Sequence, residues 1–219
     1  MTISGDTPAP PGLDEAVRAA TSEEGRVWLD EALAEIESNP GAVASRFPAA
    51  GRNVGRGSLL EALPPGGPLF GWTVDDAARA LLLDALGERV SGELEDLYRY
   101  GDAAERRAVL RWIGRRDDGP APACALTLVE DALRSNDPRL VAAALGPWAV
   151  RHLDAHAFRH AVLKCVFMGI PLEGVDGLAR RTDAELAEML AAYADERMAA
   201  GRAVPDDVWA VIDRVREHH

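Results

Sequence analysis

Helix-start signals recur along this chain, and they constrain its fold more than any other feature. Asp102, Asp137 and Asp154 each precede a stretch with helically spaced apolar residues, and Thr73 opens another as Thr-Val-Asp-Asp. Side-chain oxygens of this kind accept hydrogen bonds from the free amides of a helix's first turn. Pro138 suits the first helical position, where no amide hydrogen is needed. No segment alternates apolar and polar residues with a period of two, so the sequence predicts an all-α fold.

The order of these helices favours one architecture. Asp102 and Asp137 start helices one repeat length apart, and Gly146-Pro147 must break or kink the second of them. Short helices joined by short turns resemble the stacked helical pairs of HEAT repeats. We therefore expect an irregular α-solenoid, with a generic helical bundle as the alternative, in a single all-helical domain over residues 12–217. Residues 1–11, rich in Pro, Thr and Gly, are expected to form a disordered tail.

Three other regions complete the expected organisation. Thr21-Ser-Glu-Glu24 fits a capping box, and Thr182-Asp-Ala-Glu185 is expected to cap a later helix. A last helix is predicted from about Pro205, ahead of the terminal His218-His219 pair, which is typical of a tag and carries no chemical argument here. Between them, over residues 41–72, the helical pattern weakens and Gly, Pro and Arg accumulate, which predicts a long packed loop.

Composition excludes several functional classes. The net charge of −12 and the pI near 4.9 argue against general binding to nucleic acid or to anionic membranes, which requires a basic face. No apolar run approaches the roughly 20 residues that a membrane helix needs, and the N-terminus lacks a signal peptide pattern. Cys124 and Cys165 are far apart in the sequence and show no CxxC spacing, so we expect both to be free thiols. We expect a soluble, cytoplasmic protein without direct membrane insertion.

The first candidate site follows one helix. His156, His160 and Lys164 recur at intervals of four residues, so they share a face. Two histidines at this spacing can bind a metal, but no third ligand is evident and Arg159 disfavours a dication, so we predict neither metal nor cofactor. Lys164, the only lysine, lies between apolar residues, where a half-buried amine could anchor an anion or act as a nucleophile. The plain alternative is a solvated helix face with a surface lysine.

Two further groups of cationic residues are candidates for ligand binding. Arg52 and Arg56 lie among glycines that would let a ligand approach the backbone, and guanidinium groups match carboxylate or phosphate. The alternative is that these arginines tie the loop to acidic helices. Asn136 and Arg139 form a weaker group beside Asp137, whose own role is explained by helix capping.

Several blocks of the sequence, in the same order, resemble the EboA family of bacterial proteins over roughly residues 20–212. The blocks are FPAAGRNVGR, LYRYGDAAERRAVLR, DALRSNDPRLVAAALGP, VLKCVFMGIPL and ERMAAGR. The chain departs from the family pattern at Trp148 and Phe158, where Tyr and Trp are expected, and at Asn53, where a basic residue is expected. The resemblance implies a place beside a prenyltransferase-like membrane protein and several enzymes in the movement of secondary metabolites or their precursors across the inner membrane. It supplies no catalytic residue.

The sequence supports three hypotheses about function. The leading one is a cytoplasmic accessory protein of secondary-metabolite traffic or biosynthesis that binds a small anionic metabolite or a partner protein of the same pathway. The second is an enzyme of that pathway that uses Lys164 with a histidine such as His160. The third is a helical interaction scaffold, which needs an exposed apolar patch, with the five tryptophans as the candidate residues. The candidate ligand-binding residues are Arg52, Arg56, Asn136, Arg139, His160 and Lys164.

Overall fold

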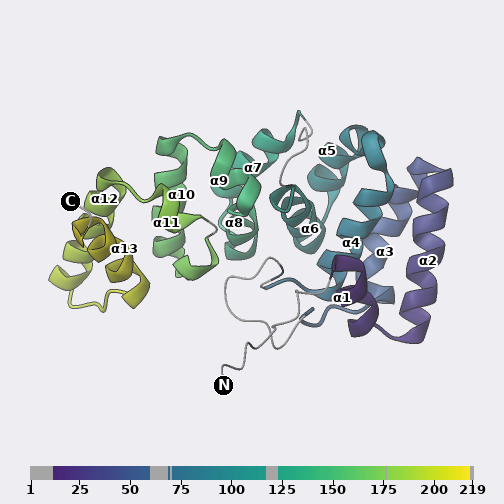
Figure 1. Ribbon diagram of the computed structural model, residues 1–219, viewed down its shortest axis with the longest axis horizontal. Helices are drawn as coiled ribbons and strands as arrows, with labels where there is room; N and C mark the ends of the chain where they lie inside the picture. The colour runs from purple at the N-terminus through teal and green to yellow at the C-terminus, as the bar shows by residue number, and fades with distance from the viewer. Residues whose placement is uncertain (1–11, 60–68, 70, 117–122, 176, 218–219) are drawn as a thin grey trace, which may run out of the picture.

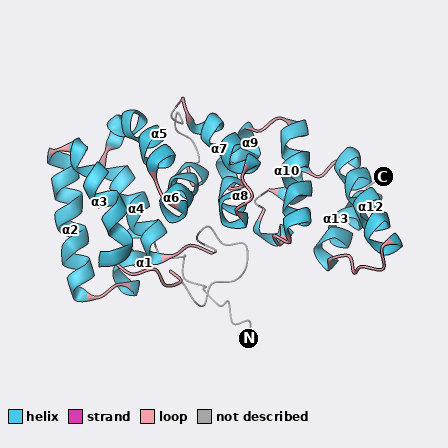
Figure 2. Cartoon of the chain, turned by 180° about the vertical axis from the view of Figure 1, so that it is seen from behind, coloured by secondary structure: helices cyan, strands magenta, loops and turns pink. Residues whose placement is uncertain are grey.

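The computed structural model describes residues 12–59, 69, 71–116, 123–175 and 177–217. Within these residues it contains thirteen α-helices, three short 3-10 helices and no strand, apart from one isolated bridge between Ser58 and Thr73. Helices joined by loops make up every described part of the chain (Figure 2). The predicted all-α fold is confirmed.

The described helices lie on either side of residues 117–122, which the structure does not describe. Before these residues lie α1 (Leu13–Ala20), α2 (Glu23–Ser38), η1 (Pro40–Ala42), α3 (Val43–Asn53), α4 (Val74–Ala85), η2 (Gly87–Arg89), α5 (Val90–Tyr100) and α6 (Ala103–Gly114). After them lie α7 (Ala125–Arg134), α8 (Pro138–Ala144), α9 (Pro147–His152), α10 (Ala155–Met168), η3 (Leu172–Gly174), α11 (Leu178–Arg181), α12 (Ala184–Ala199) and α13 (Asp206–Glu217).

The helices pack on one another in series along the length of the molecule. Figure 1 shows an elongated body with α2 near one end and α12 and α13 at the other. Contacts link α4 to α6, α6 to α8, α8 to α10 and α10 to α12, while α1, α2 and α3 pack on α4, α5 on α6, α7 on α8 and α13 on α12. The HEAT-like solenoid stays a prediction, because this order of contacts does not by itself define a repeating unit.

The strongest helix-start predictions are confirmed. The Asp102 carboxylate accepts hydrogen bonds from the amides of Ala104 and Glu105, and the Asp137 carboxylate accepts one from Arg139. Thr73 forms the complete capping box with Asp76. These bonds satisfy amides that would otherwise have no partner at the start of each helix.

The predicted break at Gly146-Pro147 is also confirmed, because α8 ends at Ala144 and α9 begins at Pro147. Gly146 has a second role that the sequence did not indicate. A Cβ atom on Gly146 would lie 3.0 Å from the Cα atom of Gly114, at the end of α6. Two facing glycines therefore allow the α8–α9 junction to contact α6 backbone to backbone.

Two predicted caps differ from the structure by one residue. Ser22, and not Thr21, caps α2, while the Thr21 hydroxyl is buried and donates to the Val54 carbonyl. Asp183 caps α12, and the Thr182 hydroxyl donates back to Leu178 in α11. In both cases the threonine binds a carbonyl of a neighbouring segment, so the next residue is left to cap the helix.

The long loop predicted for residues 41–72 is wrong over its first part. Helix α3 covers Val43–Asn53 and contains Pro48. A proline inside a helix removes one backbone hydrogen bond and opposes the helix. Complete burial of Val43, Phe47 and Ala50 offsets that cost, because these apolar side chains are spaced helically. The predicted tail at residues 1–11 lies outside the described residues.

A buried ionic network joins α3, α4 and α6. Arg79 is fully buried, pairs with the equally buried Asp75, and donates to the Phe47 carbonyl at 3.0 Å. The Asp76 carboxylate, also without exposure, pairs with Arg107 and Arg111 of α6. Burying charges is costly unless they are paired, so these contacts fix how the three helices meet.

Candidate functional site

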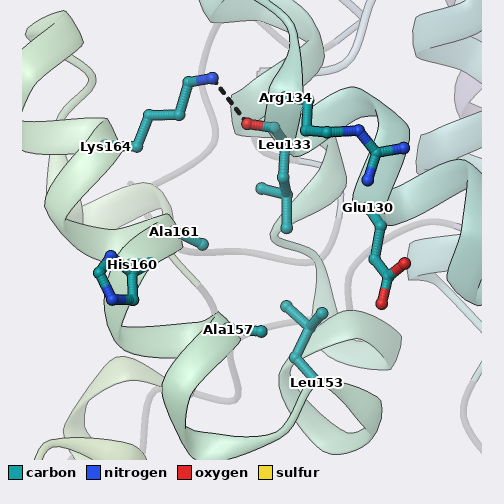
Figure 3. Close-up of a pocket in the computed structure, with 8 residues that line it drawn as sticks. All are labelled: Glu130, Leu133, Arg134, Leu153, Ala157, His160, Ala161 and Lys164. Atoms are coloured by element: carbon teal, nitrogen blue, oxygen red, sulfur yellow. Dashed lines mark hydrogen bonds between the residues drawn. The ribbon is translucent and has the colours of Figure 1, made fainter.

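A pocket of about 420 Å³ lies where α10 faces the end of α7 and the turn after α9 (Figure 3). Its volume lies within the range of about 300–1,000 Å³ that is usual for small-molecule sites. Helix α7, the turn after α9, and α10 contribute its lining, which consists of Glu130, Leu133, Arg134, Leu153, Ala157, His160, Ala161 and Lys164. The pocket therefore includes two of the residues predicted from sequence, Lys164 and His160.

The Lys164 ammonium is held at the C-terminal end of α7. Its Nζ atom donates to the Leu133 carbonyl at 2.7 Å, as Figure 3 shows. Leu133 is among the last four residues of α7, whose carbonyls lack partners inside the helix, and positive charge is stabilised at a helix C-terminus. This contact occupies one of the three N–H donors of an ammonium, so the others can serve a ligand.

The pocket rim carries more positive than negative charge. Lys164 and Arg134 supply two cations, and Glu130 supplies one carboxylate. Arg134 is 3.7 Å from Asp131, but Asp131 already accepts a 2.9 Å hydrogen bond from Arg106. Arg106 and Arg134 therefore share one carboxylate, and the Arg134 side chain is 67% exposed to solvent.

The floor of the pocket is apolar. Leu133, Leu153, Ala157 and Ala161 lie between the charged groups in Figure 3. Ala157 and Ala161 are four residues apart on α10 and therefore share a face with Lys164. Their small side chains leave the hollow that larger residues would fill.

His160 lies on the pocket wall, and its ring contacts that of His156 edge to face, with centroids 4.3 Å apart. Arg159, between them in sequence, points to α12, where it pairs with Asp183 and Glu185. Among the residues described, no three His, Cys, Asp or Glu side chains gather in a way that could hold a metal ion. Of the two histidines, only His160 lines the pocket.

The arginines expected to form a binding loop do not line this pocket. Arg52 is an exposed residue near the end of α3. Arg56 packs over Gly51, where a Cβ atom would lie 2.7 Å from its Nε atom. Burial opposes ionisation of Asp102, but hydrogen bonds from the Glu105 and Ala104 amides, with smaller effects of the Arg79 and Arg56 charges, lower its pKa, so the Arg56 guanidinium lies within electrostatic reach of the start of α6.

An arginine earlier in α3 ties this segment to an acidic helix. Arg46 pairs with Glu35 of α2. In the third predicted group, Arg139 forms two hydrogen bonds with Asp137, and this pairing lowers the pKa of the Asp137 carboxyl. Asn136 is exposed beside it. None of these residues lines the Lys164 pocket.

Sequence reasoning missed the pocket residues on α7 and at the turn before α10. Glu130 and Arg134 lie on the exposed side of α7 and form no local motif with Lys164. The tryptophans expected to be exposed in a scaffold are buried or half-buried: Trp72, Trp112 and Trp148 belong to the core, and Trp28 and Trp209 pack against it. Their positions weaken the scaffold hypothesis, because these side chains do not form an exposed apolar patch.

Within the described residues, no helix combines the length and apolar character that crossing a membrane requires.

Comparisons with known proteins yield one match. No curated protein and no solved structure matches the chain. A family model described as the metabolite traffic protein EboA matches residues 12–213, which is nearly the whole chain and contains the range expected from the sequence blocks. The chain belongs to the EboA family.

Proposed function

We propose that this chain is a cytoplasmic accessory protein that binds a small anionic metabolite in the Lys164 pocket. Membership of the EboA family implies a role in a metabolite traffic pathway. The anion and its binding site are our proposal, and one observation carries it: Lys164 is anchored on the Leu133 carbonyl while Arg134, sharing its carboxylate with Arg106, stands on the same rim. An ammonium and a guanidinium that line the same pocket would attract a negatively charged ligand.

The surroundings of Lys164 favour binding over catalysis. A nucleophilic lysine must lose its proton, which an apolar pocket or neighbouring cations promote. Here the Nζ atom is instead held by the hydrogen bond that it donates to the Leu133 carbonyl, at the C-terminal end of α7. A charged ammonium is a poor nucleophile but a good anchor for a carboxylate or phosphate. The volume of about 420 Å³ suits a small molecule better than a protein segment.

The elongated arrangement also supports an irregular α-solenoid, which we propose as the framework of the site. The serial contacts from α4 through α6, α8 and α10 to α12 are those expected of stacked helical pairs. The pocket would then lie at a junction between neighbouring pairs, where the end of α7 meets α10.

The single lysine allows a direct test of anion binding. Selective 15N-lysine labelling gives one backbone amide signal in the chain, that of Lys164. Titration with inorganic phosphate and with acetate at low salt should shift this signal to saturation. Arg134→Gln should weaken binding several-fold, because it removes one of the two rim cations.

The matched control is Arg202→Gln, which removes the same charge from an exposed position after α12. It should bind phosphate as the unmodified chain does. A shift that never saturates, or one that both substitutions weaken equally, would reflect only the general ionic atmosphere and would end the proposal.

A further inference from the structure

We infer that the ligand of the Lys164 pocket is amphipathic, with one anionic head and a short unbranched apolar body. The inference rests on the proposed function and adds a chemical class to it. It is carried by the apolar floor, in which Ala161, Ala157 and Leu153 lie in a row that leads from Lys164 to the turn after α9 (Figure 3).

The apolar floor of the pocket runs along α10. Along α10 the pocket residues run from Lys164 through Ala161 to Ala157, and Leu153 closes the far end (Figure 3). Lys164 lies seven positions after Ala157, which corresponds to roughly 10 Å at the helical rise per residue. A head group bound at the ammonium therefore has an apolar path leading away from it along the helix.

Small residues create this path. Ala157 is half-buried and Ala161 is almost fully buried, and Leu133 faces them from α7. Ala157, Ala161, Leu133 and Leu153 supply the apolar surface of the pocket, and the polar side chains of His160 and Glu130 border it. A purely inorganic anion would leave this apolar surface in contact with water, whereas an alkyl body would cover it.

The affinity of the pocket for aliphatic carboxylates should accordingly depend on the length of their alkyl chain. Each methylene that moves from water onto the floor should tighten binding by about two- to fourfold, the upper value applying to complete burial. The gain should stop when the chain outgrows the roughly 10 Å path. Charge alone predicts no such dependence, since all members of a series of aliphatic carboxylates carry one negative charge.

The experiment titrates the full chain, labelled with 15N-lysine, with acetate, butyrate, hexanoate and octanoate. Ala157→Leu fills the floor and leaves Lys164, Arg134 and Glu130 in place, so it should abolish the gain with chain length while phosphate binding persists. Ala161→Leu is a second floor-filling variant. Ala34→Leu, on the exposed side of α2, is the matched control and should keep the full gain. Circular dichroism checks that each variant is folded.

The outcomes separate the two proposals. Equal affinities for acetate and hexanoate, with saturable phosphate binding, would overturn the amphipathic ligand and leave the anion site standing. A gain that survives both floor-filling substitutions would also overturn it, because the alkyl chain would then bind elsewhere. Absence of saturable binding by any of these anions would instead count against the proposed function itself.

Discussion

The Asp75 carboxylate and the Arg79 guanidinium form an ion pair in the interior, where neither side chain has appreciable exposure to solvent. Asp75→Ala would leave the guanidinium buried without its counter-ion, and we expect it to lower the free energy of unfolding by about 3–5 kcal/mol. Urea denaturation measures this change. Glu95→Gln is the matched control, because Glu95 and Arg99 form an exposed pair with the same spacing, worth about 0–1 kcal/mol.

Replacing both members of the buried pair tests whether the uncompensated charge causes the loss of stability. The double variant Asp75→Ala/Arg79→Met should be less destabilised than Asp75→Ala alone, because no uncompensated charge remains inside the protein. If the double variant were instead the less stable of the two, direct packing of Arg79 on Phe47 and its bond to the Phe47 carbonyl would dominate.

The pair between Arg159 and Asp183 predicts a pH-dependent stability. The hydrogen bonds from Arg159 lower the pKa of the Asp183 carboxyl below its ordinary value. A carboxyl whose pKa is lowered on folding stabilises the folded state above its unfolded pKa, and this contribution is lost as the pH falls through the folded pKa. Asp183→Asn keeps a residue able to cap α12 but removes the charge.

Thermal unfolding should therefore show a lower Tm for Asp183→Asn than for the unmodified chain at pH 7. The two Tm values should converge at acidic pH, below the ordinary pKa of Asp, about 4. A constant difference across the whole pH range would show that the substitution acts through packing or capping and not through the charge.

The two cysteines should differ in reactivity. Burial raises the pKa of the Cys165 thiol to about 12, so almost none of the reactive thiolate exists at pH 8. Cys124 is only half-buried, although burial raises its pKa as well. Iodoacetamide at pH 8 should modify Cys124 first, and Cys165 only after unfolding in urea. Mass spectrometry of Cys124→Ser, in which Cys165 is alone, would contradict this if the folded protein were labelled as fast as the unfolded one.

Glu130 is the carboxylate on the pocket rim and should oppose anion binding. Glu130→Gln should tighten phosphate binding by about two- to fivefold at low salt, because a like charge near the bound anion is removed. The gain should shrink as salt is added. Glu31→Gln removes the same charge from an exposed position on α2 and should change little. An equal gain in phosphate affinity in both variants would indicate an effect of the protein's net charge.

Local chemistry made much of the fold predictable. Asp102 and Asp137 cap their helices because each lies directly before an apolar helical pattern, and that signal needs no knowledge of distant residues. Helix α3 escaped prediction because Pro48 and Gly51 weaken the local pattern, whereas the burial that stabilises the helix comes from contacts with α2 and α4. Local preference was overridden there by tertiary packing.

The candidate site was only partly predictable for the same reason. His160 and Lys164 share one helix, so their spacing places them together. Glu130 and Arg134 reach the pocket only because α7 ends beside α10, and no sequence spacing encodes that meeting. Arg52, Arg56, Asn136 and Arg139 carry the same chemistry as the rim cations, but the fold places them outside the pocket lining.

The serial packing from α4 to α12 has a consequence for how the protein opens. A helix in such a series is supported mainly by its immediate neighbours, so the terminal pair α12–α13 can detach while the opposite end stays intact. Amide exchange should accordingly be graded along the molecule, fastest in α13 and slowest in the α4–α6 region, where buried charges cross-link the helices. The Lys164 pocket lies between these extremes, and a bound ligand would raise protection there first.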